Sequence, residues 1–229
     1  MNFLKLGLLA GALLLAGGAT QPNWNNNVVE TDTGHRIGNP DAKVQLVEFV
    51  SYTCPHCAHF ADQGDPVLKI LYVHTGKVAV EIRHFLRDPV DLTAALMAQC
   101  GDPSRFALNH SALMASQSKW LPLMGSASPA QIQRWSNPDS AAARRAIASD
   151  FGFYKMMEGR GYRVTDLDKC ISDNARAREL AEATRADAKK YGIRGTPSFA
   201  INGKLLGHVH DWDALKPQID TALASITAN

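Results

Sequence analysis

The apolar residues of this chain follow two periods, one typical of strands and one typical of helices. Residues 43–50 are mostly apolar and rich in valine, which is typical of a buried central strand. From Pro55 the apolar positions take a helical spacing, and Gly64 and Pro66 predict a kink or break in that helix. Residues 78–85 alternate between apolar and polar side chains, which predicts a second strand. A strand, a helix and a strand in this order predict a parallel βαβ unit.

The middle of the chain lacks a comparable strand pattern. Helical spacing continues over residues 89–190, with candidate helices at 94–100, 106–116, 140–157, 166–172 and 175–191. Beyond it, residues 198–201 and 204–208 flank Asn202-Gly203, the strongest short signal for a β-hairpin. Residues 213–226 close the chain with the spacing of an amphipathic helix. The predicted order is therefore βαβ, a helical segment, and ββα.

The N-terminal residues predict export. Residues 1–19 contain one positive charge, Lys5, then an apolar run and the small residues Gly17-Gly18-Ala19, which is the pattern of a secretory signal peptide cleaved near Ala19. The apolar run is shorter than the roughly 20 residues that cross a bilayer, so a retained anchor is the weaker interpretation. Loss of Lys5 lowers the net charge from +2 to +1, which gives no reason to expect nucleic acid as a partner. Residues 20–40 are polar and are expected to form a loose arm.

Two cysteines, Cys54 and Cys57, follow the first predicted strand with two residues between them. A C-x-x-C by itself is compatible with a redox dithiol, half of a zinc site, a haem attachment site or a chance spacing. Cys54 would lie at a helix N-terminus, where backbone N–H groups and the helix dipole favour a thiolate. Pro55 suits the first helical turn because it lacks an N–H group. His56 could donate a hydrogen bond or a charge to the Cys54 thiolate.

Two further features bear on this dithiol. Gly195-Thr196-Pro197 precedes the predicted third strand, and an X-Pro bond can be cis at small cost. Without the C-x-x-C, an ordinary loop would be the better interpretation of these residues. Glu48 lies on the first strand, six residues before Cys54. A buried carboxylate is costly without a partner, so Glu48 either has a specific role or occupies an edge position that reaches solvent.

A complete zinc site would require a second pair of ligands. Cys100 and Cys170 stand apart in the sequence, and His208 and His210 lie beside the predicted hairpin. The remaining histidines that bear on this question stand singly: His59, His74, His84 and His110. Only half of the usual ligand set is visible, so no metal and no other cofactor are expected.

The order of elements, the C-x-x-C at the first helix and the proline before the third strand together resemble the thioredoxin fold with a helical insertion. More narrowly, the chain resembles the DsbA family of exported dithiol oxidases. The similarity in layout extends over most of the chain, and the specific motifs lie within residues 47–60 and 195–201. We therefore expect an α/β thioredoxin-like domain made of residues 41–88 and 191–229, interrupted by a helical insertion at 89–190.

The resemblance assigns roles to individual residues. In the thioredoxin fold the cis-proline lies beside the reactive cysteine, which implies that the backbone at Thr196 pairs with an extended substrate peptide. Thr196, Pro197 and Pro55 are the expected substrate contacts. Glu48 matches the buried acid of the DsbA pattern, which can relay protons. An acidic residue that the family pattern places four positions after the second cysteine is absent here, because Ala61 stands there.

Four cysteines allow three pairings, and the C-x-x-C uses one pair, which leaves Cys100 with Cys170. Some relatives of the DsbA type have a second, non-catalytic disulfide in the helical insertion. An oxidising compartment favours such a bridge. Two buried free thiols are the alternative.

The leading hypothesis is a monomeric periplasmic dithiol oxidase that acts on unfolded or cysteine-containing exported proteins. The resemblance implies a membrane quinone-linked oxidase as its recycling partner. An isomerase or reductase is the alternative within the enzyme class: Thr196 before the proline favours it, whereas Thr53 in place of a tryptophan and the expected absence of a dimerising N-terminal domain oppose it. A peptide- or metal-binding module with a vestigial dithiol is the alternative from another class.

Overall fold

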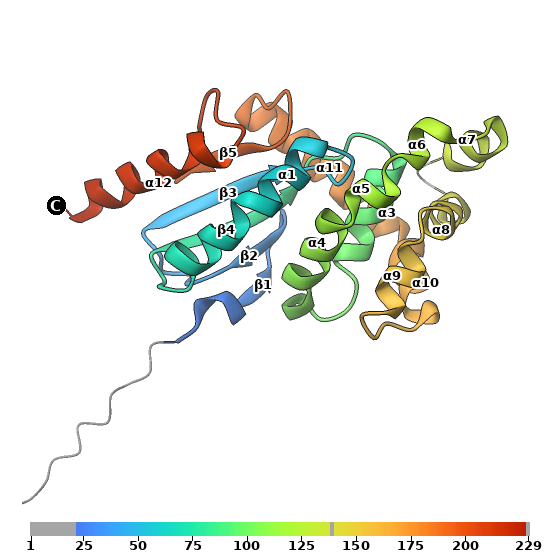
Figure 1. Cartoon of the computed structure of the whole chain (residues 1–229), viewed down its shortest axis with the longest axis horizontal. Coiled ribbons are helices and arrows are strands. Elements are labelled where there is room, and N and C mark those ends of the chain that lie inside the picture. The colour runs from blue at the N-terminus through green and yellow to red at the C-terminus, as the bar shows by residue number, and fades with distance from the viewer. Residues whose placement is uncertain (1–21, 138–139, 228–229) are drawn as a thin grey trace, which may run out of the picture.

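The computed structural model describes residues 22–137 and 140–227, and the predicted signal peptide lies outside these residues. One sheet forms the centre of the molecule, and a layer of helices lies beyond one end of it (Figure 1). The strand order in the sheet is β1-β2-β4-β3-β5-β6. Only β3 and β4 are parallel, and the other neighbours are antiparallel. The strands are β1 Val28–Glu30, β2 His35–Ile37, β3 Val44–Val50, β4 Val78–His84, β5 Ser198–Ile201 and β6 Lys204–Leu205.

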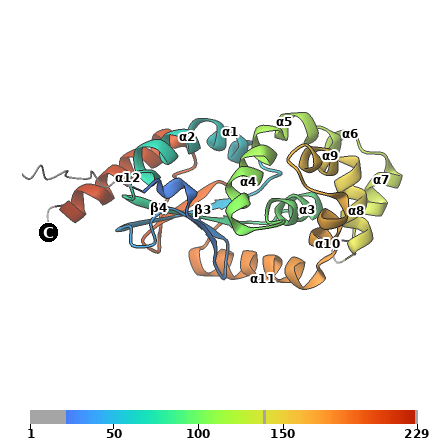
Figure 2. The same cartoon turned by 90° about the horizontal axis from the view of Figure 1, so that it is seen from below.

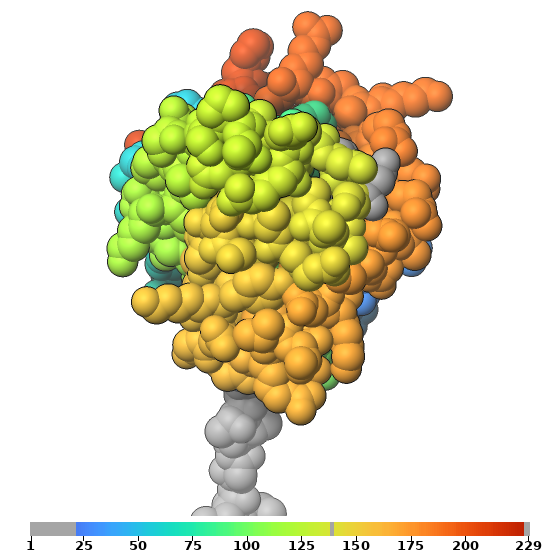
Figure 3. All heavy atoms as spheres, turned by 90° about the vertical axis from the view of Figure 1, so that its right-hand side faces the viewer, coloured from blue at the N-terminus to red at the C-terminus, as the bar shows by residue number. Residues whose placement is uncertain are grey.

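Helices cover both faces of this sheet and build the layer beyond it. Figure 2 shows α1, α2 and α12 on one face and α11 on the other. Figure 3 shows that the segment between α6 and α11 forms the end of the molecule. None of the helices in the described residues is long and apolar enough to cross a membrane. The helices are η1 Trp24–Asn26, α1 Pro55–Gln63, α2 Asp65–Leu68, the π-helix η2 Lys69–Val73, α3 Pro89–Ala98, η3 Pro103–Arg105, α4 Phe106–Ala115, α5 Gln117–Trp120, α6 Leu123–Ser126, α7 Pro129–Trp135, α8 Ala141–Asp150, α9 Phe153–Glu158, α10 Val164–Ser172, α11 Asn174–Tyr191 and α12 Trp212–Thr227.

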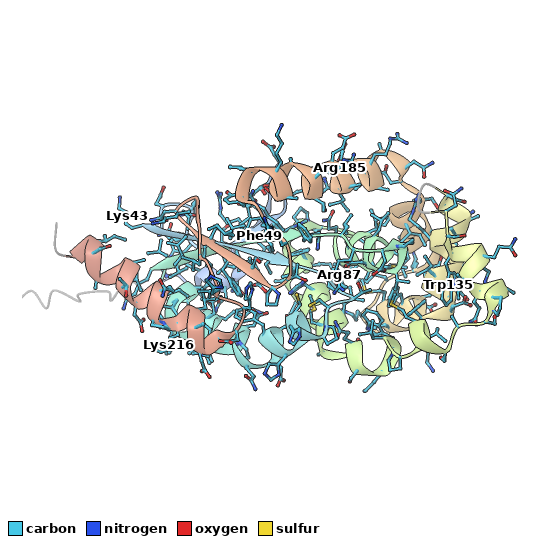
Figure 4. All side chains as sticks on the ribbon, turned by 90° about the horizontal axis from the view of Figure 1, so that it is seen from above. Lys43, Phe49, Arg87, Trp135, Arg185 and Lys216 are labelled. Atoms are coloured by element: carbon cyan, nitrogen blue, oxygen red, sulfur yellow. A yellow bond between two sulfur atoms is a disulfide. The ribbon has the colours of Figure 1, made fainter. Side chains whose placement is uncertain are left out.

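The continuous apolar run of β3 reflects burial on both faces of the sheet. Leu46 and Val50 belong to the large core that also contains the buried residues of α1 and α12. Phe49 belongs to a smaller core on the opposite face, where its ring lies 5.1 Å from that of Tyr191 at the end of α11. In Figure 4, Phe49 lies on β3 beside α11. The predicted α/β thioredoxin-like fold is confirmed, with β3-α1-β4 as the parallel unit and β5-β6-α12 as the final one.

Part of the predicted loose arm at residues 20–40 belongs to the sheet instead. β1 and β2 form an antiparallel hairpin, and β2 also pairs with β4. The hydroxyl groups of Thr31 and Thr33 each donate to Oε1 of Glu81 on β4, at 2.7 Å. Strands of three residues are too short to show a period of two in the sequence, which is why this hairpin was not predicted.

The helical segment contains more and shorter helices than the sequence predicted. The helix predicted at 140–157 is two helices, α8 and α9, because Gly152 between them has φ of +71° and ends the first. The short helices α5, α6 and α7 were not predicted. The helix predicted at 94–100 begins earlier, at Pro89, because the carboxylate of Asp88 caps it by accepting from the N–H of Asp91.

The boundary expected at residue 190, between the helical insertion and the second part of the thioredoxin-like domain, falls within α11. This helix leaves the helical layer and continues across the second face of the sheet (Figure 2). The hydroxyl of Thr184 donates to the carbonyl of His84 at 3.0 Å, and Asp187 forms an ion pair with Arg83 at 3.0 Å. The second half of α11 therefore packs with the sheet, which an amphipathic pattern alone does not reveal.

Cys100 and Cys170 form a disulfide that joins the end of α3 to α10, with Cα atoms 5.6 Å apart. Replacing both cysteines by alanine is expected to lower the free energy of unfolding by about 4 kcal/mol, because the bridge constrains a long loop of the unfolded chain. Denaturant titration measures the change, and dithiol exchange at the distant C-x-x-C should stay close to that of the wild type. Equal stability of the two proteins, or both thiols alkylated in the non-reduced wild type, would contradict this role.

Candidate active site

The C-x-x-C lies where β3 ends and α1 begins. Cys54 is the N-cap of α1, with extended φ and ψ of −99° and 115°, and Pro55 is the first helical residue. The carbonyl of Cys54 accepts hydrogen bonds from the N–H groups of Cys57 and Ala58, at 3.1 and 3.3 Å, which closes the first turn. The missing N–H of Pro55 costs nothing at this position. The local sequence thus places both thiols at the positive end of the helix dipole.

The two thiols have opposite pKa shifts. A hydrogen bond with the Cys57 thiol lowers the pKa of Cys54 to about 5, and Thr196 and the backbone N–H groups of Cys57 and His56 lower it further against the effect of burial. Burial, followed by the interaction with Cys54, raises the pKa of Cys57 well above its ordinary value. Cys54 is therefore the more acidic thiol of the pair, which is the property that a nucleophilic cysteine requires.

The loop before β5 lies against these thiols. The Thr196–Pro197 peptide bond is cis, and the carbonyl of Thr196 accepts a hydrogen bond from Sγ of Cys54 at 3.2 Å. The loop is held on its other side by His210, whose Nδ1 donates to the carbonyl of Pro197 at 2.8 Å. His210 lies beyond the predicted hairpin, 13 residues after Pro197, so its contact with this loop leaves no local pattern in the sequence.

The side chain of His56 forms no hydrogen bond with Cys54 in the described residues, so the hydrogen bond considered from the sequence is not formed and the effect of a charge on His56 stays a prediction. Its imidazole is exposed, and its contribution to the Cys54 thiolate is its backbone N–H. The side chain instead lines a cavity of about 560 Å³ beside the dithiol. The cavity is formed by His56, His59, Phe60, Gln63, Gly195, Thr196, His210, Asp211 and Trp212.

Glu48 is 1% exposed on the central strand β3, which excludes an edge position. Its Oε2 has no hydrogen-bond partner, and burial, followed by the charge of Asp65, raises its pKa well above the ordinary value. Asp65 is itself buried and lies 3.7 Å from Nζ of Lys69. The pattern considered from the sequence places an acidic residue at the position of Ala61. In this chain the acidic residue is Asp65, four residues later.

The helical layer also reaches the turn that carries Cys54. Nε2 of Gln117 donates to the carbonyls of Tyr52 and Cys54, at 2.7 and 2.9 Å. The hydroxyl of Thr53 donates to the carboxylate of Asp88 at 2.6 Å. Sequence analysis missed these residues, because contacts between positions this far apart leave no local pattern.

Across residues 22–137 and 140–227, no three His, Cys, Asp or Glu side chains lie close enough to hold a metal ion. Three features of the site occur together: a thioredoxin-like sheet, an acidic thiol at a helix N-terminus and a cis-proline that faces it. This combination is that of a thiol–disulfide exchange protein.

Comparison with known proteins agrees with this class. A family model described as Thioredoxin matches residues 30–221. A putative protein-disulfide oxidoreductase of Rickettsia bellii is 32% identical over 168 residues, which are 73% of this chain and 56% of that protein. The crystal structure of a protein-disulfide isomerase from Novosphingobium aromaticivorans is 49% identical, with a TM-score of 0.80, over 83% of this chain and 98% of that one.

The alpha-DsbA1 structure of Wolbachia pipientis has a TM-score of 0.65 at 22% identity, over 84% of this chain and 92% of that one. The chain therefore belongs to the thioredoxin-like protein-disulfide oxidoreductases, and it shares its fold with alpha-DsbA1. It spans only 56% to 62% of the length of the Rickettsia relatives that it matches.

Proposed function

We propose that this protein is a dithiol oxidase that introduces disulfides into exported proteins through Cys54 and Cys57. The observation that carries the proposal is the position of Cys54 at the N-terminus of α1, with its Sγ 3.2 Å from the carbonyl of Thr196 in the cis Thr196–Pro197 loop. In this setting the pKa of Cys54 is lowered to about 5, and that of the partner thiol is raised. A stabilised thiolate favours the reduced form of the pair. Its disulfide is correspondingly a stronger oxidant.

The reaction begins with the Cys54–Cys57 disulfide. A substrate thiolate attacks Sγ of Cys54, a mixed disulfide forms, and the Cys57 sulfur leaves and takes up a proton. A second substrate thiolate then attacks the substrate sulfur of the mixed disulfide, and Cys54 leaves as a thiolate. The substrate loses two electrons and the Cys54–Cys57 pair gains them. Glu48 is the proposed proton donor and acceptor beneath the site, because it is a buried carboxylate whose pKa is raised by burial and whose Oε2 has no hydrogen-bond partner in the described residues.

Substrate recognition is assigned to the loop at the cis-proline and to the adjacent cavity. An extended peptide would pair with the backbone at Thr196, beside Pro197 and Pro55, so that its cysteine approaches Cys54. The cavity that includes His56 and Trp212 would receive neighbouring side chains. Unfolded exported proteins with cysteine pairs are the proposed substrates.

The cellular setting forms part of the proposal. A monomer in the periplasm, released by cleavage near Ala19, would meet such substrates during export. A membrane quinone-linked oxidase would return the dithiol to its disulfide. Isomerisation is the second candidate, since the Novosphingobium aromaticivorans relative bears the name protein-disulfide isomerase.

The reduction potential of the Cys54–Cys57 pair tests the direction of the reaction. We expect equilibration with glutathione to give a potential well above the roughly −270 mV of thioredoxin, because the reduced state is stabilised by the Cys54 thiolate. Oxidation of a dithiol peptide should be faster than rearrangement of a substrate with scrambled disulfides. A potential at or below that of thioredoxin would refute the oxidase, and faster rearrangement would favour the isomerase.

A further inference from the structure

The turn between β3 and α1 is held by a buried carboxylate of the helical layer. Asp91 lies in the first turn of α3 and is 0% exposed. Its carboxylate accepts three hydrogen bonds, from the hydroxyl of Ser51 at 2.5 Å, the N–H of Tyr52 at 2.7 Å and the N–H of Arg87 at 3.0 Å. Arg87 lies where the sheet meets the helical layer (Figure 4). Two of the three donors therefore belong to the turn that leads into the C-x-x-C.

Ser51 connects this carboxylate to the second thiol. Its backbone N–H donates to Sγ of Cys57 at 3.5 Å, while its hydroxyl donates to Asp91. The N–H of Ser51 acts to lower the pKa of Cys57, against burial and the neighbouring Cys54, which raise it. The orientation of Ser51 thus bears directly on the sulfur that leaves during oxidation of a substrate.

The other side chains that hold the turn act on different atoms. Asp88 accepts from the hydroxyl of Thr53, and Gln117 donates to the carbonyls of Tyr52 and Cys54. Neither of them contacts the Ser51 hydroxyl directly in the described hydrogen bonds. Thr53 does, because its N–H donates to the Ser51 hydroxyl at 3.2 Å and its own hydroxyl lies 3.2 Å from the same oxygen. Among the carboxylates of the layer, Asp91 is the one hydrogen-bonded to Ser51 in the described residues.

Asp91 is an expensive choice for a purely structural link. No Lys or Arg side chain forms an ion pair with it in the described residues. Burial raises its pKa to about 7 against the three hydrogen bonds that favour the charged form. A buried carboxylate with no cation costs stability. Both of its oxygens are nevertheless needed, because the N–H of Tyr52 and the N–H of Arg87 donate to different ones.

We infer that Asp91 is a positioning residue for thiol exchange: it holds Ser51 so that the Ser51 N–H stabilises the sulfur of Cys57 in the reduced site. This inference rests on the proposed function, since it concerns the same dithiol, and it identifies how the helical layer controls that dithiol. Without the Asp91–Ser51 hydrogen bond, the hydrogen bond from the Ser51 N–H to Sγ of Cys57 becomes weaker. That bond stabilises the dithiol more than the disulfide, so its weakening shifts the equilibrium toward the disulfide. The protein would become a weaker oxidant.

Asp91→Asn and Ser51→Ala test the inference. Whichever way the introduced amide turns, its NH2 group faces a backbone N–H donor, from Tyr52 or Arg87, so the carboxylate geometry is lost. The equilibrium measured is protein disulfide plus two glutathione thiols against protein dithiol plus glutathione disulfide. Each variant should shift it about 3- to 10-fold toward the protein disulfide, the range expected for one hydrogen bond.

A double-mutant cycle and a control separate positioning from a general loss of stability. The Asp91→Asn/Ser51→Ala double variant should shift the equilibrium no further than Ser51→Ala alone, because Ser51→Ala already removes the bond to Asp91 together with the contacts between the Ser51 hydroxyl and Thr53. Asp187→Asn removes another carboxylate, 3% exposed, from its pair with Arg83, and should lower stability without moving the glutathione equilibrium.

Additive shifts of the two single variants, or an equilibrium equal to that of the wild type, would overturn the inference. If Asp91→Asn fails to fold, Ser51→Ala is measured alone. A glutathione equilibrium of Ser51→Ala equal to that of the wild type would then overturn the inference. The outcome is independent of the absolute potential. A wild type as reducing as thioredoxin would refute the oxidase, yet a coupled shift between variants would still support the positioning role.

Discussion

Cys54→Ser is expected to abolish dithiol exchange, and Cys57→Ser is expected to accumulate mixed disulfides with substrate. The pKa of Cys54 is lowered to about 5, so at neutral pH its thiolate is the leaving group when a substrate is oxidised and the attacking group when a substrate disulfide is reduced. Without Cys57, the Cys54 thiolate can still attack a disulfide of an oxidised substrate, which expels one substrate thiolate and leaves the other substrate sulfur joined to Cys54. The protein then has no neighbouring thiol to release that mixed disulfide. Oxidation of a dithiol peptide measures the first effect, and non-reducing electrophoresis shows the trapped adducts of the second.

The matched control is the Cys100→Ala/Cys170→Ala variant, which also loses two cysteines but at a bridge outside the site. It should retain exchange and form no trapped adducts. Alkylation of the reduced wild type should follow ionisation of Cys54, with a midpoint near its pKa of about 5. Normal exchange by the Cys54 variant would mean that the nucleophile is wrongly assigned.

The parts of the site that the sequence predicted are encoded over short distances. A buried strand followed directly by C-x-x-C and Pro55 requires Cys54 to cap the helix, whatever lies elsewhere in the chain. Asn202-Gly203 predicts a two-residue hairpin turn, and both residues have positive φ, 49° and 81°. Such signals depend on the conformational preferences of a few neighbouring residues.

The parts that could not be predicted depend on how distant segments pack. Asp91 and Ser51 are 40 residues apart, and Gln117 and Cys54 are 63 apart. In the sequence, Asp91 is one more acidic residue in the first turn of a helix, a common position that requires no ligand. Asp65 gave a weaker but usable signal, since it follows Ala61 by four residues, just beyond the helix that carries the C-x-x-C.

Packing also explains three buried histidines near the active-site turn. His35 on β2, His84 on β4 and His110 on α4 are 1%, 3% and 1% exposed. His35 stacks on Phe106 with ring centroids 3.9 Å apart, and Nδ1 of His110 is hydrogen-bonded to the hydroxyl of Tyr52 at 2.9 Å. Both ring nitrogens of His84 lack a partner in the described residues. The three rings therefore occupy an environment that does not stabilise a charge.

Burial is the first cause of a lowered pKa for each of them: to about 4 for His35, to about 3 for His110, and well below 6.5 for His84. Unfolding exposes them to water, where the pKa of histidine is about 6.5. Below that pH the unfolded state binds protons that the folded state does not. The stability that they contribute is thus complete above about pH 6.5 and is lost as the pH falls toward the folded values.

For His84→Leu we compare the free energy of unfolding with that of the wild type at pH 5 and at pH 7. The difference, variant minus wild type, is expected to be about 2 kcal/mol more positive at pH 5, because the variant has no buried imidazole to protonate on unfolding. Urea titrations of both proteins at the two pH values give this difference. The carboxylates Glu48 and Asp91, whose raised pKa values act in the opposite direction, contribute equally to both proteins and cancel. His59→Leu, at an exposed position, is the matched control and should show a much smaller change. A stability difference for His84→Leu that is the same at pH 5 and pH 7 would show that the imidazole is already charged in the folded protein.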